Sequence, residues 1–187
     1  MNNYYIDHYV KVLRKGELLL YPTDTVWGIG CDATDKVAVE RIFNLKRRHE
    51  SKSMVILVHS LEMLKQYVSE IPQVVIELIQ STIAPTSIIY SNPKDLASNV
   101  IAEDNTVAIR LVKDEFCELL IEKLGKPIVS TSANISGEPT PKNFNEISEE
   151  IKKNVDCIVN WRQDEKIEKT ASHIVKINPD GSLYYIR

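Results

Sequence analysis

The apolar residues of this chain follow two patterns, a helical spacing and short unbroken runs, and the two patterns alternate. Tyr5, Tyr9 and Leu13 recur with helical spacing ahead of Gly16, which predicts an opening helix that ends at a glycine. The apolar run 18–21 follows directly and predicts a strand that is buried on both faces. The chain is therefore expected to begin with a helix and then to enter a sheet.

The same alternation continues along the whole chain. Asp35 and Asp114 stand where they can cap helices, the first running into the basic stretch 46–48 and the second through Lys123. The charged segment 162–170 is expected to be a mobile loop. Further helices are predicted at 61–68, 72–80 and 145–153, and further strands at 54–58, 87–90, 106–111, 127–130, 157–160, 173–177 and 183–186. This order predicts an α/β fold, a single domain over 1–187 in which helices flank one twisted, mixed sheet.

Composition excludes several classes of protein. The 187 residues are 43% hydrophobic and 26% charged, as in globular proteins, and the formal net charge of −3 gives no protein-wide basic field for nucleic acid. The three cysteines form no Cys-x-x-Cys pair and the four histidines are scattered, so neither a disulfide framework nor a metal site is predicted. Because an apolar signal core and a membrane-length run are both missing, we expect a cytoplasmic protein that does not enter the membrane.

The first segment with candidate chemistry is 21–33, where a predicted strand runs into a turn rich in hydroxyl groups and glycine. Open α/β sheets bind ligands outside the carboxyl ends of their strands. Gly28, Gly30 and Ala33 match a dinucleotide-binding pattern, but no convincing βαβ unit with a ribose-binding acid follows. The alternative is a turn in which 23–25 satisfy their own backbone.

The second segment is basic and carries four cations between Lys46 and Lys52. Cations at a helix C-terminus are favoured by the helix dipole, so a purely structural role is one interpretation. The other is an electrostatic clamp for phosphate, in which lysine supplies a point charge and arginine a planar fork. Such a clamp could replace a glycine-rich phosphate loop.

The third segment is 126–141, in which a short apolar strand leads into a run of small hydrogen-bonding side chains. Serine and asparagine carry donors and acceptors with little bulk, which suits a loop that wraps sugar, phosphate and carboxylate oxygens. Ser132 has Thr131 and Ala133 as neighbours, so the surroundings typical of a serine nucleophile are missing. A ligand-binding loop is therefore favoured over a hydrolase site.

Five motifs then occur together in the order of one family. They are Thr-Asp-Thr-Val-Trp-Gly at 23–28, Lys-x-Arg at 46–48, Val-Ala-Ile-Arg at 107–110, Ser-Thr-Ser-Ala-Asn-x-Ser-Gly-x-Pro at 130–139 and Ala-Ser-His-Ile-Val at 171–175. Over about residues 8–187 the chain resembles the short, single-domain form of the YrdC/TsaC family, the L-threonylcarbamoyladenylate synthases of tRNA modification. The resemblance implies a YrdC-like fold with a large, concave, basic site. It also implies a nucleotidyltransferase that converts L-threonine, bicarbonate and ATP into threonylcarbamoyl-AMP and pyrophosphate.

The resemblance also assigns ligand-binding residues. Those implied around L-threonine are Thr25, Arg110, Ser130 and Ser172. Those implied around ATP are Lys46, Arg48, Lys52, Thr106, Ser132, Asn134, Thr140 and Arg187. Lys46 and Arg48, from the Lys-x-Arg motif, are the expected catalytic residues, because catalysis would rest on alignment and on neutralising the charge of pyrophosphate.

Cofactor and partners follow from the same resemblance. Magnesium would accompany ATP, and the protein itself would hold no metal. The product would pass to a separate transferase complex of the TsaD type, which modifies adenosine 37 of tRNA, and a weak contact with tRNA is possible under this scheme. Two alternatives stay open: a paralogue that binds tRNA or double-stranded RNA as a module, and one that adenylates another carbamoyl substrate.

Overall fold

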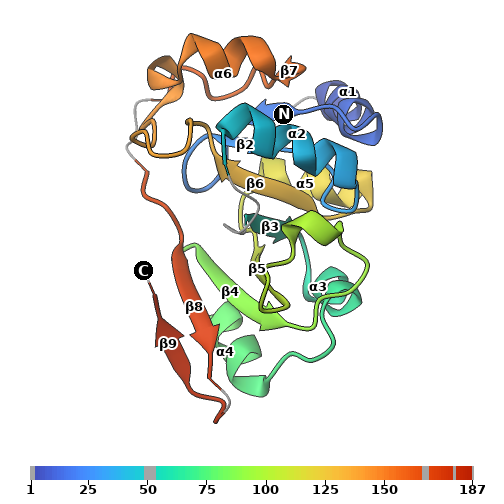
Figure 1. Ribbon diagram of the computed structural model, residues 1–187, viewed down its shortest axis with the longest axis vertical. Helices are drawn as coiled ribbons and strands as arrows, with labels where there is room; N and C mark the ends of the chain where they lie inside the picture. The colour runs from blue at the N-terminus through green and yellow to red at the C-terminus, as the bar shows by residue number, and fades with distance from the viewer. Residues whose placement is uncertain (1–2, 49–53, 166–168, 179, 187) are drawn as a thin grey trace.

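The computed structural model describes residues 3–48, 54–165, 169–178 and 180–186 (Figure 1). Within these ranges nine strands form one mixed sheet in the order β7-β1-β2-β6-β3-β5-β4-β8-β9. The strands are β1 Leu19–Tyr21, β2 Gly28–Gly30, β3 Val55–Val58, β4 Thr86–Ser91, β5 Thr106–Leu111, β6 Ile128–Ser132, β7 Cys157–Ile158, β8 His173–Ile177 and β9 Leu183–Tyr185. Three of the strand pairs, β1–β7, β3–β5 and β4–β8, are parallel and the others are antiparallel. The predicted α/β fold with a mixed sheet is confirmed.

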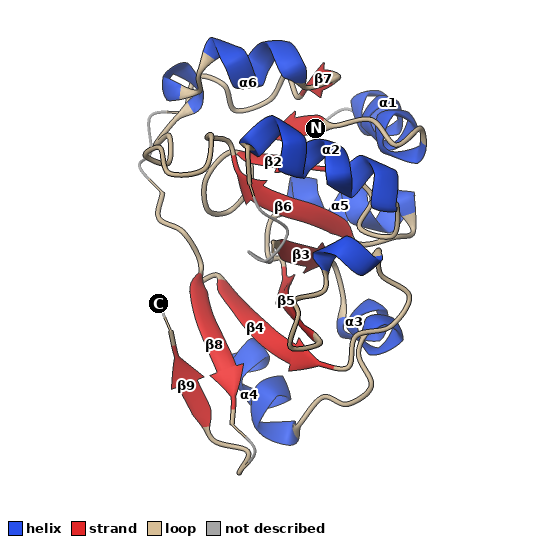
Figure 2. Cartoon of the chain, in the orientation of Figure 1, coloured by secondary structure: helices blue, strands red, loops and turns tan. Residues whose placement is uncertain are grey.

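The sheet turns strongly from one end to the other. In Figure 2 the strands β2 and β6 run across the upper part of the molecule, whereas β4, β8 and β9 run steeply through the lower part. This rotation is the accumulated right-handed twist of neighbouring strands. The upper and lower strands therefore run in different directions, and β3 and β5 connect them in the middle of the sheet (Figure 2).

Helices cover the sheet on both sides. In Figure 1, α2 lies in front of the upper strands and α5 lies behind them, next to α1. The helices are α1 Asn3–Arg14, α2 Lys36–Lys46, α3 Leu61–Tyr67, α4 Gln73–Ser81, α5 Glu115–Leu124 and α6 Glu149–Asn154, with short 3-10 turns at Ser98–Val100 and Phe144–Glu146. None of the helices described is long and apolar enough to cross a membrane.

The predicted helix signals act where expected. The carboxylate of Asp35 accepts hydrogen bonds from the amides of Val37 and Ala38, and that of Asp114 accepts from the amide of Cys117. Gly16 has a φ of 72°, in the left-handed region that suits the residue after a helix end. These local signals explain why the predicted ends of α1, α2 and α5 agree with the structure.

Two predictions about secondary structure are wrong. The predicted helix at 145–153 is divided into a 3-10 turn and α6, because the Ser148 side chain accepts from the amide of Ile151 and starts a new helix. Strand β2 has no counterpart in the prediction. A Cβ atom at Gly30 would lie 2.5 Å from the Val129 carbonyl oxygen and 2.7 Å from the Tyr21 ring, so glycine lets β1, β2 and β6 pack closely.

The segment 162–170, expected to be a mobile loop, is tied down in its described part. The Arg162 guanidinium lies 2.7 Å from a carboxylate oxygen of Asp114, and Lys169 donates to the Thr23 carbonyl oxygen at 3.1 Å. Charge along the sequence predicts exposure, but here the charged groups pair with partners far away along the chain. These two side chains therefore have partners that the sequence did not predict.

Candidate active site

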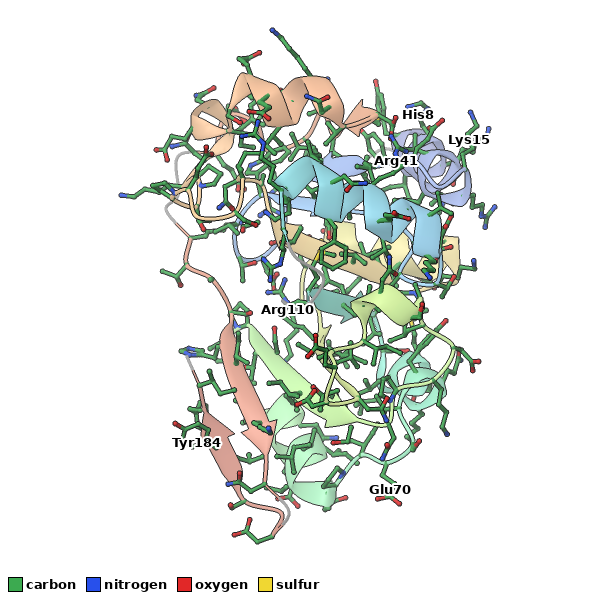
Figure 3. The ribbon with its side chains drawn as sticks, viewed as in Figure 1. His8, Lys15, Arg41, Glu70, Arg110 and Tyr184 are labelled. Atoms are coloured by element: carbon green, nitrogen blue, oxygen red, sulfur yellow. The ribbon has the colours of Figure 1, made fainter. Side chains whose placement is uncertain are left out.

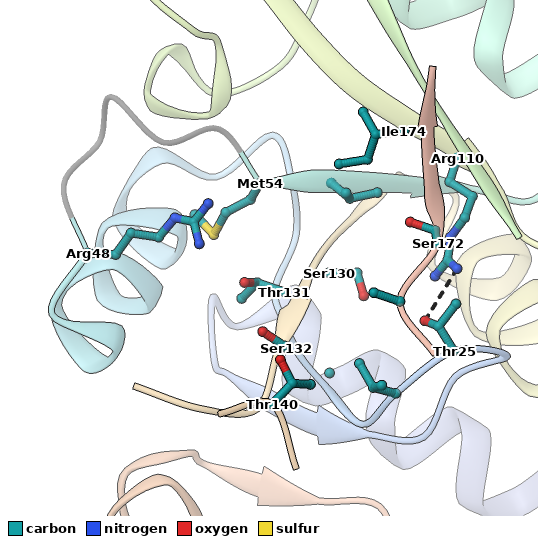
Figure 4. Close-up of a pocket in the computed structure, with 14 residues that line it drawn as sticks. Thr25, Arg48, Met54, Arg110, Ser130, Thr131, Ser132, Thr140, Ser172 and Ile174 are labelled. Carbon is teal, nitrogen blue, oxygen red and sulfur yellow. Dashed lines mark hydrogen bonds between the residues drawn. The ribbon is translucent and has the colours of Figure 1, made fainter. Parts of the chain in front are cut away.

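An open cavity of about 200 Å³ lies at the centre of the twisted sheet (Figure 4). The carboxyl end of β6, the beginning of β3, strand β5, the β1–β2 loop and the segment before β8 all border it. Its lining residues are Thr25, Val26, Gly28, Arg48, Met54, Val55, Arg110, Ser130, Thr131, Ser132, Thr140, Ala171, Ser172 and Ile174. Two arginines and no acidic residue belong to this described lining, so the cavity suits anionic ligands.

Arg110 lies at one side of this cavity and at the centre of the whole molecule (Figure 3). Its side chain is 3% exposed, and its Nη1 donates to the Thr25 hydroxyl at 3.3 Å and lies 3.1 Å from an Asp24 carboxylate oxygen. Its Nε has no hydrogen-bond partner among the described residues. A buried guanidinium with an unused donor at the edge of a cavity can bind a carboxylate or phosphate oxygen.

Asp24 was not singled out from the sequence, although it is the direct partner of Arg110. Burial raises the pKa of its carboxyl group, and the nearby Arg110 guanidinium acts in the opposite direction. An aspartate between two threonines gives no local signal that would predict an ion pair with Arg110. Only the fold brings β5 beside the β1–β2 loop and reveals the pair.

The β1–β2 loop is held by its own hydroxyl groups. The Thr25 amide donates to the Thr23 hydroxyl at 2.9 Å, and that hydroxyl donates to the Val26 carbonyl oxygen at 2.8 Å. The interpretation of 23–25 as a turn that satisfies its own backbone therefore holds for Thr23. Thr25 does more, because its hydroxyl also accepts from Arg110 and borders the cavity (Figure 4).

Two serines complete this side of the cavity. The Ser172 hydroxyl lies 2.9 Å from that of Ser87, a residue of β4 that is fully buried. Ser130 faces Gly28, where a Cβ atom would lie 3.1 Å from the serine oxygen. Glycine at that position therefore leaves the Ser130 hydroxyl open to the cavity.

The other side of the cavity carries Arg48, Ser132 and Thr140. Figure 4 shows Arg48 across the cavity from Arg110, with Ser132 and Thr140 close to one another. Arg47 ends α2 in the left-handed conformation, at φ 50°, and pairs with Glu150 at 2.6 Å, whereas Arg48 borders the cavity. Burial lowers the pKa of the Arg48 guanidinium, a shift that a bound anion would oppose.

Lys46 lies behind the cavity wall instead of at its surface. The residue is 1% exposed, and its ammonium group donates to the carbonyl oxygens of Ser132 and Asn134, the latter at 2.6 Å. Burial, reinforced by the charge of Arg48, lowers the pKa of Lys46 to about 7. The described geometry thus makes Lys46 a support for the end of β6, whereas the sequence suggested a phosphate contact.

Two further predicted residues, Asn134 and Thr106, are described by the structure but do not line the cavity. The Asn134 amide group donates to the carbonyl oxygens of Ile135 and Glu138, which closes the loop after β6. Thr106 shares a face of β5 with Arg110, four residues away, and its hydroxyl donates to Asp104 at 2.6 Å. Lys52 and Arg187 lie outside the described residues.

The comparison with known families decides the classification. The sequence matches the family Sua5_yciO_yrdC, described as "Telomere recombination", over residues 11–187. The chain belongs to this family. The family resemblance seen in the five sequence motifs is therefore confirmed.

Members of the Sua5_yciO_yrdC family with curated names extend this result. The chain is 35% identical over 149 residues to the threonylcarbamoyl-AMP synthase of Pyrococcus abyssi, covering 79% of this chain and 44% of that relative's length. It is 31% identical over 156 residues to the threonylcarbamoyl-AMP synthase of an Enterobacter species, covering 79% and 81%. The crystal structure of P. abyssi Sua5 complexed with L-threonine matches with a TM-score of 0.88 at 27% identity, covering all of this chain and 54% of that one.

Proposed function

We propose that this protein is a threonylcarbamoyl-AMP synthase, which joins L-threonine, bicarbonate and the adenylyl group of ATP and releases pyrophosphate. One observation carries the proposal. The four residues that the family pattern assigns to threonine border one cavity together with three of those that it assigns to ATP, namely Arg48, Ser132 and Thr140. Such an arrangement supports a reaction between two bound substrates, because both can be held with their reacting atoms together.

L-threonine would occupy the side of Arg110. Its carboxylate would meet the Arg110 guanidinium, whose Nε still has a hydrogen to donate. The hydroxyl groups of Thr25, Ser130 and Ser172 would bind the amine and the side-chain hydroxyl. The complex of P. abyssi Sua5 with L-threonine supports this ligand class for the family fold.

ATP would occupy the side of Arg48. The guanidinium would neutralise phosphate charge, and the hydroxyls of Ser132 and Thr140 would donate to phosphate or ribose oxygens. Lys52, Thr106, Asn134 and Arg187 remain proposed contacts to the nucleotide. Magnesium would arrive as part of the substrate MgATP, with phosphate oxygens and water as its ligands, since no carboxylate belongs to the described cavity lining.

The chemistry needs no covalent intermediate on the protein. The threonine amine adds to the carbon of bicarbonate with loss of water and gives a carbamate. A carbamate oxygen then attacks the α-phosphorus, the bond from that phosphorus to the bridging oxygen breaks, and pyrophosphate leaves with the electron pair. Arg48 would stabilise the charge that builds on pyrophosphate, while Lys46 would act indirectly by holding Ser132 and Asn134.

The product would serve a later step. Threonylcarbamoyl-AMP is a mixed anhydride that an acceptor amine can attack, and we propose that a TsaD-type complex transfers its acyl group to adenosine 37 of tRNA in the cytoplasm. A direct tRNA contact, if it occurs, would be weak, because the net charge of −3 offers no broad basic surface.

The test is pyrophosphate release from purified protein with threonine, bicarbonate and ATP omitted in turn. The proposal predicts release only when all three are present, together with a product of the mass of threonylcarbamoyl-AMP. Salt-sensitive tRNA binding without ATP consumption would instead identify a binding module.

A further inference from the structure

Arg162 lies outside every motif used so far, yet its side chain is only 15% exposed. The guanidinium has three partners from three parts of the chain. Its Nη1 donates to an Asp114 carboxylate oxygen at 2.7 Å, its Nε to Glu165 at 2.8 Å and its Nη2 to the Thr23 carbonyl oxygen at 3.0 Å. The backbone at Arg162 has a φ of 59°, a conformation that non-glycine residues adopt rarely. A charged residue is held here at a cost in backbone strain, which indicates a specific role.

Two of these partners lie next to segments that line the Arg110 side of the cavity. Thr23 precedes Thr25 in the β1–β2 loop, and the Thr25 amide donates to the Thr23 hydroxyl. Asp114 follows β5, the strand that carries Arg110, and its other carboxylate oxygen caps α5. The Arg162 guanidinium therefore fixes the distance between the loop that presents Thr25 and the strand that presents Arg110.

A second cation strengthens the same link. Lys169 Nζ donates to the Thr23 carbonyl oxygen at 3.1 Å and lies 3.4 Å from a Glu165 carboxylate oxygen. Glu165 thus pairs with both cations, and Asp114 supplies the second negative charge. From Lys169 the chain reaches Ser172, which borders the cavity, within three residues.

We propose that Arg162 is a positioning residue for the amino-acid side of the cavity, acting through Thr23 and Asp114 without touching a ligand. The proposal rests on the proposed function for the identity of the ligand. Thr25 and Arg110 are themselves 3.3 Å apart, so a small displacement of the loop would open the contact that prepares the carboxylate site. A flexible lysine at position 162 could reach one acceptor, but it has no planar fork to hold several.

The experiment compares Arg162→Ala, Arg162→Lys and Asp114→Asn with the parent protein. Asp114→Asn keeps an oxygen to cap α5 but removes the ion pair, so it guards against a folding defect in Arg162→Ala. The matched control is Arg41→Ala, because Arg41 also binds one carbonyl oxygen, of Gly16 at 3.1 Å, and one carboxylate, of Asp156 at 2.9 Å. Arg41 lies on α2, away from Arg110 (Figure 3).

The expected result is a rise of roughly tenfold in the threonine KM of Arg162→Ala, with the ATP KM within about twofold of the parent. Arg162→Lys should recover part of this loss, Asp114→Asn should shift the same constant, and Arg41→Ala should change neither. An unchanged threonine KM in Arg162→Ala and Asp114→Asn, or equal changes in both KM values, would overturn the proposal.

A second measurement separates this inference from the proposed function. Hydrogen exchange of the Thr25 amide should become faster in Arg162→Ala and stay the same in Arg41→Ala, whether or not the protein turns over threonine. Unchanged Thr25 exchange would refute the link through Thr23. If the parent releases no threonine-dependent pyrophosphate, the proposed function fails while the exchange result still decides the role of Arg162.

Discussion

The two sides of the cavity are built in different ways. On the Arg110 side, Thr25, Arg110 and Ser172 are at most 7% exposed, and each contacts a side chain from a distant part of the sequence. On the Arg48 side, Arg48 is only half-buried and Thr140 is exposed, and both lie on connections between elements. The Arg110 side is thus built from buried residues of the core, whereas the Arg48 side depends on connections between elements.

This difference suggests how the two substrates would be bound. A site formed by buried, mutually bonded groups is preorganised, so little ordering remains for binding and small ligands can be distinguished closely. A site on connections can adjust to a larger and more flexible ligand at an entropic cost. The Arg110 side therefore suits a small amino acid, and the Arg48 side a nucleotide.

The largest expected effect is that of Arg110→Ala. It removes a buried cation, leaves Asp24 without its partner and should weaken the use of threonine by about 3 kcal/mol, roughly a hundredfold. The measurement is the threonine dependence of pyrophosphate release, and the ATP KM is the internal control. An unaltered threonine response would remove Arg110 from this role.

Arg48→Ala should act on the other substrate. Loss of a charged hydrogen bond to phosphate should weaken ATP use by about 2 kcal/mol, roughly thirtyfold, and leave the threonine KM nearly unchanged. Arg47→Ala is the matched control, because the neighbouring Arg47 pairs with Glu150 at the surface. Equal effects of the two alanine variants would contradict a separate role for Arg48.

Lys46 connects the Arg48 side to the core. The lowered pKa of its ammonium group should make the stability of the protein depend on pH, and this dependence can be measured. Its folded-state pKa of about 7 lies below the ordinary value of 10.5, so between these values the unfolded chain binds more protons. The free energy of unfolding should therefore rise with pH in this window, by at most about 1.4 kcal/mol per pH unit from this group.

The measurement is urea unfolding of the parent and of Lys46→Met at pH 7 and at pH 9. Methionine keeps the approximate length of the side chain without a titrating group, so the rise should be smaller in the variant. Identical pH dependence in the two proteins would show that Lys46 keeps an ordinary pKa and is not buried as described.

The smallest expected effect concerns Ser87→Ala. Ser87 is fully buried and its hydroxyl lies 2.9 Å from that of Ser172, so its loss removes one of the contacts that orient the Ser172 hydroxyl. The threonine KM should rise roughly fivefold, which corresponds to a loss of about 1 kcal/mol in binding free energy, and the ATP KM should stay unchanged. A larger effect on ATP than on threonine would show that Ser172 belongs to the other side.

The sequence predicts this architecture best where structure is decided locally. Asp35, Asp114 and Gly16 act on residues within a few positions, and the helix ends that they predict agree with the structure. Strand β2 exists only because β1 and β6 lie beside it, and β6 begins about a hundred residues later. No local pattern contains that information.

The same distinction applies to the candidate site. The motifs contain Thr25, Arg48, Arg110, Ser130 and Ser172, all of which line the cavity. They do not reveal that Lys46 turns away from it, since this depends on carbonyl groups more than eighty residues away. Two partners of Arg162 are hidden in the same way, because Asp114 and Thr23 lie 48 and 139 residues away along the chain and only the fold brings them to Arg162.

The measurement that tests the central claim most directly is a crossed pair of Michaelis constants. Threonine and ATP KM values for pyrophosphate release would be determined for the parent, Arg110→Ala and Arg48→Ala. A cavity with two sides predicts that Arg110→Ala raises chiefly the threonine constant and Arg48→Ala chiefly the ATP constant. If both variants raised the same constant, or both constants equally, the division of the cavity between two substrates would be contradicted.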